Sequence, residues 1–207
     1  VFEGPSNHHY ETTDYRKIDH RLGTNEEFKT LTAEMKRVGI RTVIDTVFNH
    51  TSVDFFPFKD LREKGAESKY RDWYWVKSFP IKVERNPNYE AWYGFGSLPK
   101  LNVDTPAATQ YLLDTVDYWQ KNFSVDGLRL DVGNEVSQAF WRKFRSRAKT
   151  GNPNTWIVGE VWTDASQWLK GDQWDASMNY PFSFAVQKFV RPESPVSPSD
   201  LWTELLS

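Results

Sequence analysis

Two apolar β-type runs, each ending on a carboxylate, constrain the fold of this chain more than any other feature. The first run spans Gly127 to Asp131 and the second spans Ile157 to Glu160. Between them, residues 135–149 carry apolar side chains at i, i+4 spacing, which predicts one helix. Strand, helix, strand is a parallel crossover unit that brings both strand ends to one rim of a sheet. The sequence therefore predicts an Asp and a Glu facing each other, the pair that cleaves glycosidic bonds.

The same alternation of strands and helices continues along the chain. Strands are predicted at residues 40–45, 126–131, 155–160 and 174–179. The helices between them are predicted at residues 24–38, where Thr24 and Glu27 form a capping box, and at 106–123, 135–149, 165–169, 181–190 and 201–206. Residues 1–23 show no sustained period and are predicted as a loop. This order indicates an α/β fold with a parallel sheet, holding about half the strands of an eightfold barrel.

The composition excludes several classes of function. Lys and Arg number 26 against 28 Asp and Glu, a net charge of −2, so no basic patch favours nucleic acid. The absence of Cys excludes a disulfide framework, a cysteine-ligated metal and a thiol nucleophile. No apolar stretch approaches the length of a membrane span, and no signal-type sequence opens the chain. We expect neither nucleic acid nor a membrane as partner. The absence of Cys and of a signal-type sequence slightly favours the cytoplasm. The compartment is otherwise unknown, because the chain begins in mid-fold.

Aromatic residues are unusually frequent, at 16% of the chain. Such rings either build a large core or stack against the flat faces of sugars, and composition does not separate the two. Many of them fall in residues 51–100, a long charged stretch without a periodic pattern. A stretch of this length inside a compact domain is usually functional or forms a small subdomain.

Four motifs, in order, resemble those of the α-amylase family of glycoside hydrolases. Residues 45–50 (Asp-Thr-Val-Phe-Asn-His) are similar to the block ending the third barrel strand, and residues 98–102 (Leu-Pro-Lys-Leu-Asn) to the block closing the following subdomain. Residues 127–135 and 158–160 resemble the fourth- and fifth-strand blocks. Besides these four motifs, residues 6–15 are also similar to the loop after the second strand. The Pro-Lys-Leu-Asn form and the Asn-Glu pair at 134–135 are typical of the cyclomaltodextrinase, neopullulanase and maltogenic amylase branch.

The resemblance implies a partial (β/α)8 TIM barrel, holding about strands three to six with their helices. Residues 1–50 are then barrel, residues 51–102 a short irregular subdomain inserted after the third strand, and residues 103–207 barrel again. The family's block after the seventh strand, with its third essential acid, has no counterpart before Ser207. We therefore expect an internal fragment, inactive alone, of a longer enzyme that is a candidate homodimer through domains absent here.

The resemblance also implies the reaction and its two catalytic groups. The expected enzyme is a retaining α-glucan hydrolase that cleaves α-1,4-glucosidic bonds in cyclodextrins, pullulan or maltooligosaccharides, with Asp131 as nucleophile and Glu160 as general acid/base. Leu128 and Leu130 alternate with Arg129 and Asp131, so Arg129 shares a face with Asp131 and is expected to lower its pKa. The competing interpretations are a structural Arg–Asp pair and a solvent-exposed Glu at a strand end.

Three residues are expected to hold the sugar. The family motif implies that His50 hydrogen-bonds the sugar and that Tyr10 stacks beneath it. Trp92, together with Tyr93 and Phe95, precedes the 98–102 block and is expected to wall the cleft. A surface histidine, a buried loop tyrosine and ordinary core packing are the competing interpretations.

Four more residues are assigned to the surroundings of the site. Asn134 and Glu135 are expected on the leaving-group side, although helix capping alone would also explain them. Asp45 is expected to organise the rim. Asn49 matches a position that binds structural calcium in many amylases, so calcium stays open as a structural ion, while no metal or cofactor is expected for the chemistry.

Two other functions remain open at this point. An α-glucosidase or transglycosylase of the same family differs only in which acceptor attacks, and the 98–102 block and Asn134-Glu135 weigh against it. A non-catalytic amylase-like domain would be expected to lose its carboxylates, yet Asp131 and Glu160 are both present.

Overall fold

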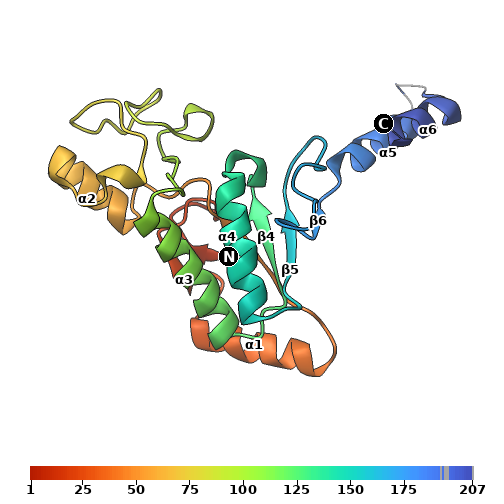
Figure 1. Ribbon diagram of the computed structural model, residues 1–207, viewed down its shortest axis with the longest axis horizontal. Helices are drawn as coiled ribbons and strands as arrows, with labels where there is room; N and C mark the ends of the chain where they lie inside the picture. Colours follow the sequence, from red (N-terminus) through yellow and green to blue (C-terminus); the bar gives the residue numbers. More distant parts are fainter. Residues whose placement is uncertain (192, 194–195, 207) are drawn as a thin grey trace.

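A four-stranded parallel sheet forms the centre of the computed structural model, which describes residues 1–191, 193 and 196–206 (Figure 1). Its strands follow the chain order β3 (Val43–Val47), β4 (Gly127–Asp131), β5 (Trp156–Gly159) and β6 (Ala176–Ser177). Each neighbouring pair is parallel, and β3 pairs with β4 so that Asp45 lies beside Arg129 and Val47 beside Asp131. The predicted parallel α/β sheet is confirmed.

Helices connect β3 to β4 and β4 to β5, and other helices precede β3 and follow β6. They are α1 (Asn25–Arg37), α3 (Pro106–Asn122), α4 (Gln138–Gly151), α5 (Tyr180–Val190) and α6 (Pro198–Leu206). The capping box of Thr24 and Glu27 opens α1 as predicted, because each side chain bonds the other residue's backbone N–H. Helices α3 and α4 lie side by side on one face of the sheet, and α5 and α6 project away from it (Figure 1).

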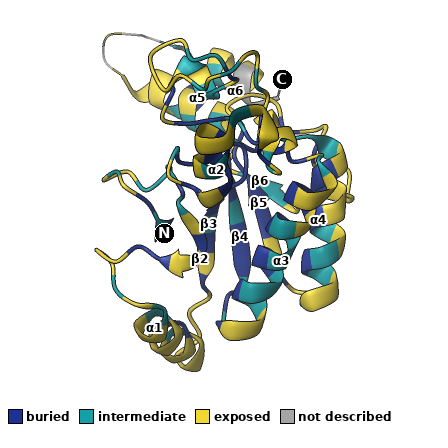
Figure 2. Cartoon of the chain, turned by 90° about the vertical axis from the view of Figure 1, so that its left-hand side faces the viewer, coloured by how far each residue is buried: buried dark blue, intermediate teal, exposed yellow. Residues whose placement is uncertain are grey.

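The core lies between the sheet and helices α3 and α4. Leu128, Leu130 and Ile157 are buried on the helix side, whereas the outer faces of the helices are exposed (Figure 2). Phe48, which follows β3, packs against two rings of α4, with centroids 5.9 Å from Phe140 and 5.7 Å from Phe144. Since the leucines of β4 point into this core, the alternate residues of the strand point to the opposite side of the sheet.

The first segment of the chain corrects one expectation. Residues 1–23 are not only loop, because β1 (Phe2–Glu3) and β2 (Asp14–Ile18) form an antiparallel pair. The pair is held by buried aromatic side chains, since Phe2 lies 5.7 Å from Tyr15 and 5.4 Å from Trp119, centroid to centroid. Trp119 also donates its indole N–H to the carbonyl of Tyr15 at 2.7 Å. These partners are distant in sequence, so no local pattern marks the strands.

Four other elements differ from the predictions. Strand β3 runs from Val43 to Val47 instead of 40–45, so Asp45 lies in its middle and not at its end. Helix α4 begins at Gln138, capped by Ser137, because residues 133–135 form a separate 3-10 turn. Residues 165–169 form hydrogen-bonded turns instead of a helix, and only Ala176–Ser177 of the predicted strand 174–179 pairs with β5.

The two ends of the segment between β3 and α3 lie next to each other. It contains α2 (Phe56–Lys64), the 3-10 turns at Gly65–Glu67, Arg71–Trp73 and Trp92–Gly94, and isolated bridges, including Ala91 to Pro99. His50 and Lys100 form a bridge, and Leu101 donates its N–H to the carbonyl of Asn49 at 2.9 Å. These bonds hold the segment above the C-terminal end of β3, beside the rim (Figure 1). The division of the chain at residues 50 and 102 stays a prediction.

Candidate active site

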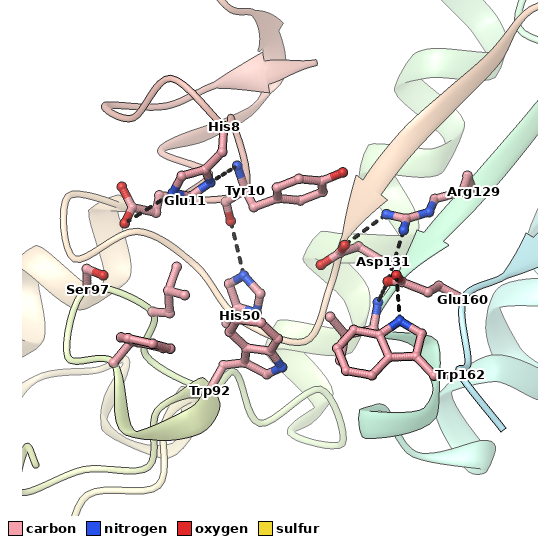
Figure 3. Close-up of a pocket in the computed structure, with 13 residues that line it drawn as sticks. His8, Tyr10, Glu11, His50, Trp92, Ser97, Arg129, Asp131, Glu160 and Trp162 are labelled. Atoms are coloured by element: carbon pink, nitrogen blue, oxygen red, sulfur yellow. Dashed lines mark hydrogen bonds and ion pairs between the residues drawn. The ribbon is translucent and has the colours of Figure 1, made fainter. Parts of the chain in front are cut away.

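Arg129, in the middle of β4, bridges three carboxylates at the rim of the sheet, and Figure 3 shows two of them, Asp131 and Glu160. Its Nη1 lies 2.8 Å from an oxygen of Asp45 and 2.8 Å from Oδ1 of Asp131, and its Nη2 lies 2.9 Å from Oε2 of Glu160. Its Nε donates to the sulfur of Met178 at 3.4 Å. The predicted contact between Arg129 and Asp131 is confirmed. One planar cation therefore fixes three acidic side chains from adjoining strands.

Burial has a larger effect on the pKa of Asp131 than Arg129 has. Burial raises the pKa of its carboxyl to about 7, and Arg129 lowers the pKa by less than burial raises it. Glu160 and Asp45 add to the increase, because nearby negative charges disfavour the ionised form. The expected lowering of the pKa by Arg129 is present, but burial outweighs it, because the side chain of Asp131 is only 8% exposed and the same cation is shared with two other acids.

Glu160 follows β5 directly and is surrounded by donors. Its Oε2 accepts the backbone N–H of Val132 at 2.9 Å, and its Oε1 accepts the indole N–H of Trp162 at 3.1 Å and the hydroxyl of Tyr180 at 3.2 Å. Burial acts to raise the pKa of Glu160, but the bonds from Val132, Trp162 and Tyr180 and the charge of Arg129 outweigh it. The pKa of Glu160 therefore lies below its usual value.

A strained backbone turn after β4 aims one of these donors. Val132 has φ of 45° and ψ of 44°, which is a rare conformation for a β-branched residue. The next residue, Gly133, has no Cβ, and one placed there would lie 2.7 Å from the ring of Trp174. The turn presents the N–H of Val132 to Glu160, so the local strain serves to join the ends of two strands.

Tyr10 is held against the site from both of its ends. Its hydroxyl donates to Asp45 at 3.1 Å. Its backbone carbonyl lies 3.1 Å from Nε2 of His50, as Figure 3 shows. The guanidinium of Arg129 lies 6.0 Å from the centre of the Tyr10 ring. Burial, followed by the charge of Asp45, raises the pKa of Tyr10 to about 12, so the hydroxyl keeps its proton and remains a donor.

His50 is a neutral residue with both ring nitrogens occupied. Burial lowers its pKa to about 4, so the ring carries one proton at neutral pH. That proton belongs on Nε2, facing the carbonyl of Tyr10, because Nδ1 lies 3.2 Å from the Nδ2 donor of Asn49. The indole of Trp92 stacks on His50, with centroids 5.8 Å apart. The predicted bond from His50 to a sugar stays a prediction, and it requires the bond to Tyr10 to be exchanged.

A cavity of about 430 Å³ opens beside the three carboxylates. Its walls combine Arg129, Asp131 and Glu160 with side chains of the first loop, which joins β1 to β2 at residues 4–13, and of the segment after β3. Trp92 and Phe95 line it, which confirms that at least one aromatic residue of that segment faces the rim. The other lining residues are His8, Tyr10, Glu11, His50, Ser97, Leu98, Val132 and Trp162 (Figure 3). A charged floor with aromatic walls suits a ligand with hydroxyl groups and flat apolar faces.

Asn134 and Glu135 lie in a smaller hollow of about 110 Å³ on the other side of Glu160. Trp92, Tyr93 and Trp162 also line this hollow. Glu135 accepts a hydrogen bond from the ammonium of Lys100 at 2.9 Å, which joins the 3-10 turn after β4 to the segment after β3. The two residues therefore lie next to the carboxylate pair, and their contact with a leaving group stays a prediction.

Asn49 offers one oxygen to a metal ion. Its Oδ1 is buried and accepts no hydrogen bond from the described residues. Calcium takes six to eight oxygen ligands. Among the described residues, the group of three acidic or His side chains close enough to share an ion lies elsewhere, at Glu3, Asp19 and His20. A structural calcium ion at Asn49 stays a prediction, and we assign no step to a metal.

Three side chains that contact the site were not singled out from the sequence. Trp162 and Tyr180 bond Glu160, and Met178 bonds Arg129. Trp162 lies two residues after Glu160, a weak signal that the sequence does contain. Met178 and Tyr180 reach the site only because the short strand β6 pairs with β5.

None of the described helices is long and apolar enough to cross a membrane.

Known proteins are similar to this chain in sequence. The family described as alpha amylase, catalytic domain, matches residues 1–198. A cyclomaltodextrinase from Geobacillus thermopakistaniensis is 45% identical over 193 residues, which are 93% of this chain and 33% of that protein. A neopullulanase 2 from Thermoactinomyces vulgaris is 44% identical over 190 residues, which are 91% of this chain and 32% of that protein.

A solved structure overlaps the whole chain. The cyclic α-maltosyl-(1→6)-maltose hydrolase of Arthrobacter globiformis, in complex with cyclic α-maltosyl-(1→6)-maltose, matches with a TM-score of 0.95 and 37% identity, covering 100% of this chain and 46% of that one. This overlap confirms the predicted partial (β/α)8 barrel. The chain spans about a third of the length of the curated relatives it matches.

Proposed function

Because the chain belongs to the α-amylase family, we propose that it carries the nucleophile and the acid/base of a retaining α-glucan hydrolase. The proposed substrates are α-1,4-linked glucans: cyclodextrins, pullulan or maltooligosaccharides. One observation supports the proposal above all others, namely that Arg129 holds Asp131 and Glu160 through two nitrogens of one guanidinium beside an aromatic cavity. Carboxyls about 5–5.5 Å apart are typical of retaining enzymes, and a shared guanidinium favours such a spacing.

In the proposed reaction, Glu160 and Asp131 act on opposite sides of the glycosidic bond. Glu160 gives a proton to the glycosidic oxygen while the bond from that oxygen to C1 breaks, and an oxygen of Asp131 forms a bond to C1. Glu160 then takes a proton from water, the water oxygen bonds to C1, and the Asp131–C1 bond breaks with its electrons returning to Asp131. Arg129 stabilises the charge of Asp131 before and after these steps.

The pKa shifts of the two carboxyls run against their proposed roles. Asp131, which must be ionised to attack, has a raised pKa, whereas Glu160, which must be protonated to act as an acid, has a lowered pKa. The two groups interact and titrate as a pair, and neither shift favours the protonation that the reaction needs. Substrate binding has to change the partners of at least one carboxyl before the bond can break.

The surrounding side chains have positions suited to holding the sugar. Tyr10 presents its ring beside Arg129 and is proposed to stack on the sugar that reacts at Asp131. His50 and the Trp92 indole that stacks on it form another wall of the same cavity. The hollow containing Asn134 and Glu135 shares Glu160 with this cavity, so we assign it to the leaving group or to the acceptor.

Product analysis separates hydrolysis from transfer by the same site. A transglycosylase forms the same covalent intermediate, so full-length enzyme incubated with maltotriose would accumulate products longer than the substrate. A hydrolase would give glucose and maltose. A non-catalytic binding domain would retain the glucan and give neither set of products.

The test uses the full-length protein that carries these residues. We expect it to hydrolyse β-cyclodextrin, pullulan or maltoheptaose and to release the α-anomer first, as observed by NMR. Asp131→Asn and Glu160→Gln should each reduce kcat by at least about a hundredfold. Asp164→Asn, at an exposed carboxylate that bonds Ser166, is the matched control and should keep full activity. Undiminished turnover by both of the first two variants, or release of the β-anomer, would refute the proposal.

A further inference from the structure

The two oxygens of Glu160 have different kinds of partners. Oε2 accepts the backbone N–H of Val132 at 2.9 Å and lies 2.9 Å from Nη2 of Arg129. Oε1 accepts only side-chain donors, the indole N–H of Trp162 at 3.1 Å and the hydroxyl of Tyr180 at 3.2 Å. Oε2 is thus bound by fixed donors at the end of β4, and Oε1 by residues on the far side of Glu160.

The bonds to Oε1 are long for bonds to a charged acceptor. Charge-assisted N–H and O–H bonds usually measure about 2.5–2.9 Å. Trp162 is half exposed, lines both the cavity and the smaller hollow, and contacts Tyr180 at a centroid distance of 6.4 Å. Weak bonds from an exposed side chain exchange more easily than those of a backbone N–H or of the partly buried guanidinium of Arg129.

Oε1 has no free position for a proton while both donors are in place. A carboxylate oxygen has two lone-pair sites, and Trp162 and Tyr180 occupy both of them. An acid needs its proton on the oxygen that faces the glycosidic bond, and Oε2 is turned toward β4. At least one donor must therefore leave Oε1 before Glu160 can protonate a substrate.

We propose that Trp162 and Tyr180 are positioning residues that form an exchangeable pair of donors on Oε1, holding Glu160 ionised in the empty site and giving way to the glycosidic oxygen when substrate binds. The inference rests on the proposed function, since only a general acid needs this exchange. It explains how substrate binding itself converts Glu160 from a base into an acid. The pair stabilises the free enzyme but not the substrate complex.

Other charged groups stay in place when a donor is removed. Arg129 and Asp131 of β4, Asp45 of β3 and the Tyr180 hydroxyl of α5 are the charged or titratable groups around Glu160. Loss of one neutral donor therefore changes only the preference of Glu160 for its ionised form. The pKa of Glu160 should rise in the free enzyme, where the donor was bound, and stay constant in the complex, where it had already left.

The experiment compares Tyr180→Phe and Trp162→Phe with the unaltered full-length enzyme, measuring kcat and kcat/KM for maltoheptaose from pH 4 to 9. Each variant keeps its ring and loses one donor. We expect kcat/KM at neutral pH to increase about three- to tenfold, because a bond to a charged group is no longer lost on binding. We expect kcat to stay constant and the gain to vanish at low pH, where Glu160 is protonated without substrate. The gain in kcat/KM without a change in kcat is not expected from a merely structural role.

Tyr70→Phe is the matched control, since its hydroxyl lies in the segment after β3, away from Glu160, and both parameters should remain unchanged. A parallel fall of kcat and kcat/KM in both variants would show that the donors act in the transition state, and unchanged parameters would show that they do not hold Glu160; either result overturns this inference alone. Full activity of Glu160→Gln would instead overturn the proposed function.

Discussion

Replacing Asp131, the proposed nucleophile, should stabilise the folded protein at alkaline pH. Asp131 has a side chain that is only 8% exposed, and burial raises its pKa from 3.8 to about 7. A carboxyl whose pKa is higher in the folded state favours folding less as pH rises from its unfolded to its folded pKa. Asp131→Asn removes this ionisation, and its amide oxygen can still accept the bond from Arg129.

The size of the stability change follows from the shift in the pKa of Asp131. A difference of about three pKa units, at ~1.4 kcal/mol per unit, amounts to about 4 kcal/mol as an upper limit. The difference in free energy of unfolding between Asp131→Asn and the unaltered protein should be constant below pH 4. It should rise in favour of the variant between pH 4 and 7 and reach its full value above pH 7. In a protein of a few hundred residues, an advantage of this order raises Tm by several degrees.

The assay is differential scanning fluorimetry of full-length protein at half-unit intervals from pH 4 to 8.5. The quantity of interest is the Tm of Asp131→Asn minus that of the unaltered protein. Asp164→Asn is the control with the opposite sign: hydrogen bonds from Ser166 lower the pKa of Asp164, so this variant should lose a little stability above pH 4. A difference for Asp131→Asn that is flat with pH, or that falls as pH rises, would refute the reasoning.

Three further changes test other parts of the site. Arg129→Lys replaces a planar donor by an ammonium that cannot hold three carboxylates, so kcat/KM should fall by about a hundred- to a thousandfold with an unchanged circular dichroism spectrum; activity within threefold would contradict the bridging role. Gly159→Ala places a methyl group against the ring of Trp174 and should destabilise the protein by about 1–3 kcal/mol in urea unfolding, and a neutral effect would show that Trp174 can move. Residues 1–207 alone should not hydrolyse maltoheptaose, because substrate positioning needs the remaining rim; measurable turnover by the purified chain would disprove this.

The sequence correctly predicts the elements that depend on residues close to one another in the chain. The capping box at Thr24 and the alternation of Leu128 and Leu130 with Arg129 and Asp131 both have the predicted result, because neighbouring residues determine them. The pairing of β1 with β2 was missed because it depends on Trp119, more than a hundred residues away. The turns at residues 165–169 have helix-like composition, but the Asp164 side chain bonds the N–H and the hydroxyl of Ser166 and favours turns over a helix.

The site shows the same division. Position along the chain was enough to bring Asp131 and Glu160 together, because parallel strands end at one rim. The protonation of the pair was not predictable in this way, since it depends on burial and on how many acids share Arg129. Likewise, Tyr180 contacts Glu160 from twenty residues further along, and this contact depends on the path of the chain between them.

The double attachment of Tyr10 has a consequence for building chimaeric enzymes. Its hydroxyl is bonded to Asp45 and its carbonyl to His50, so the first loop is fastened to both the middle of β3 and the residues after it. A first loop transplanted from another enzyme would bring an aromatic ring but not its two partners. Those partners are the Asp45 carboxylate, which accepts from the hydroxyl, and the His50 ring, which donates to the carbonyl. The loop and residues 45–50 thus form one exchangeable cassette, and a designer who replaces either part should replace both.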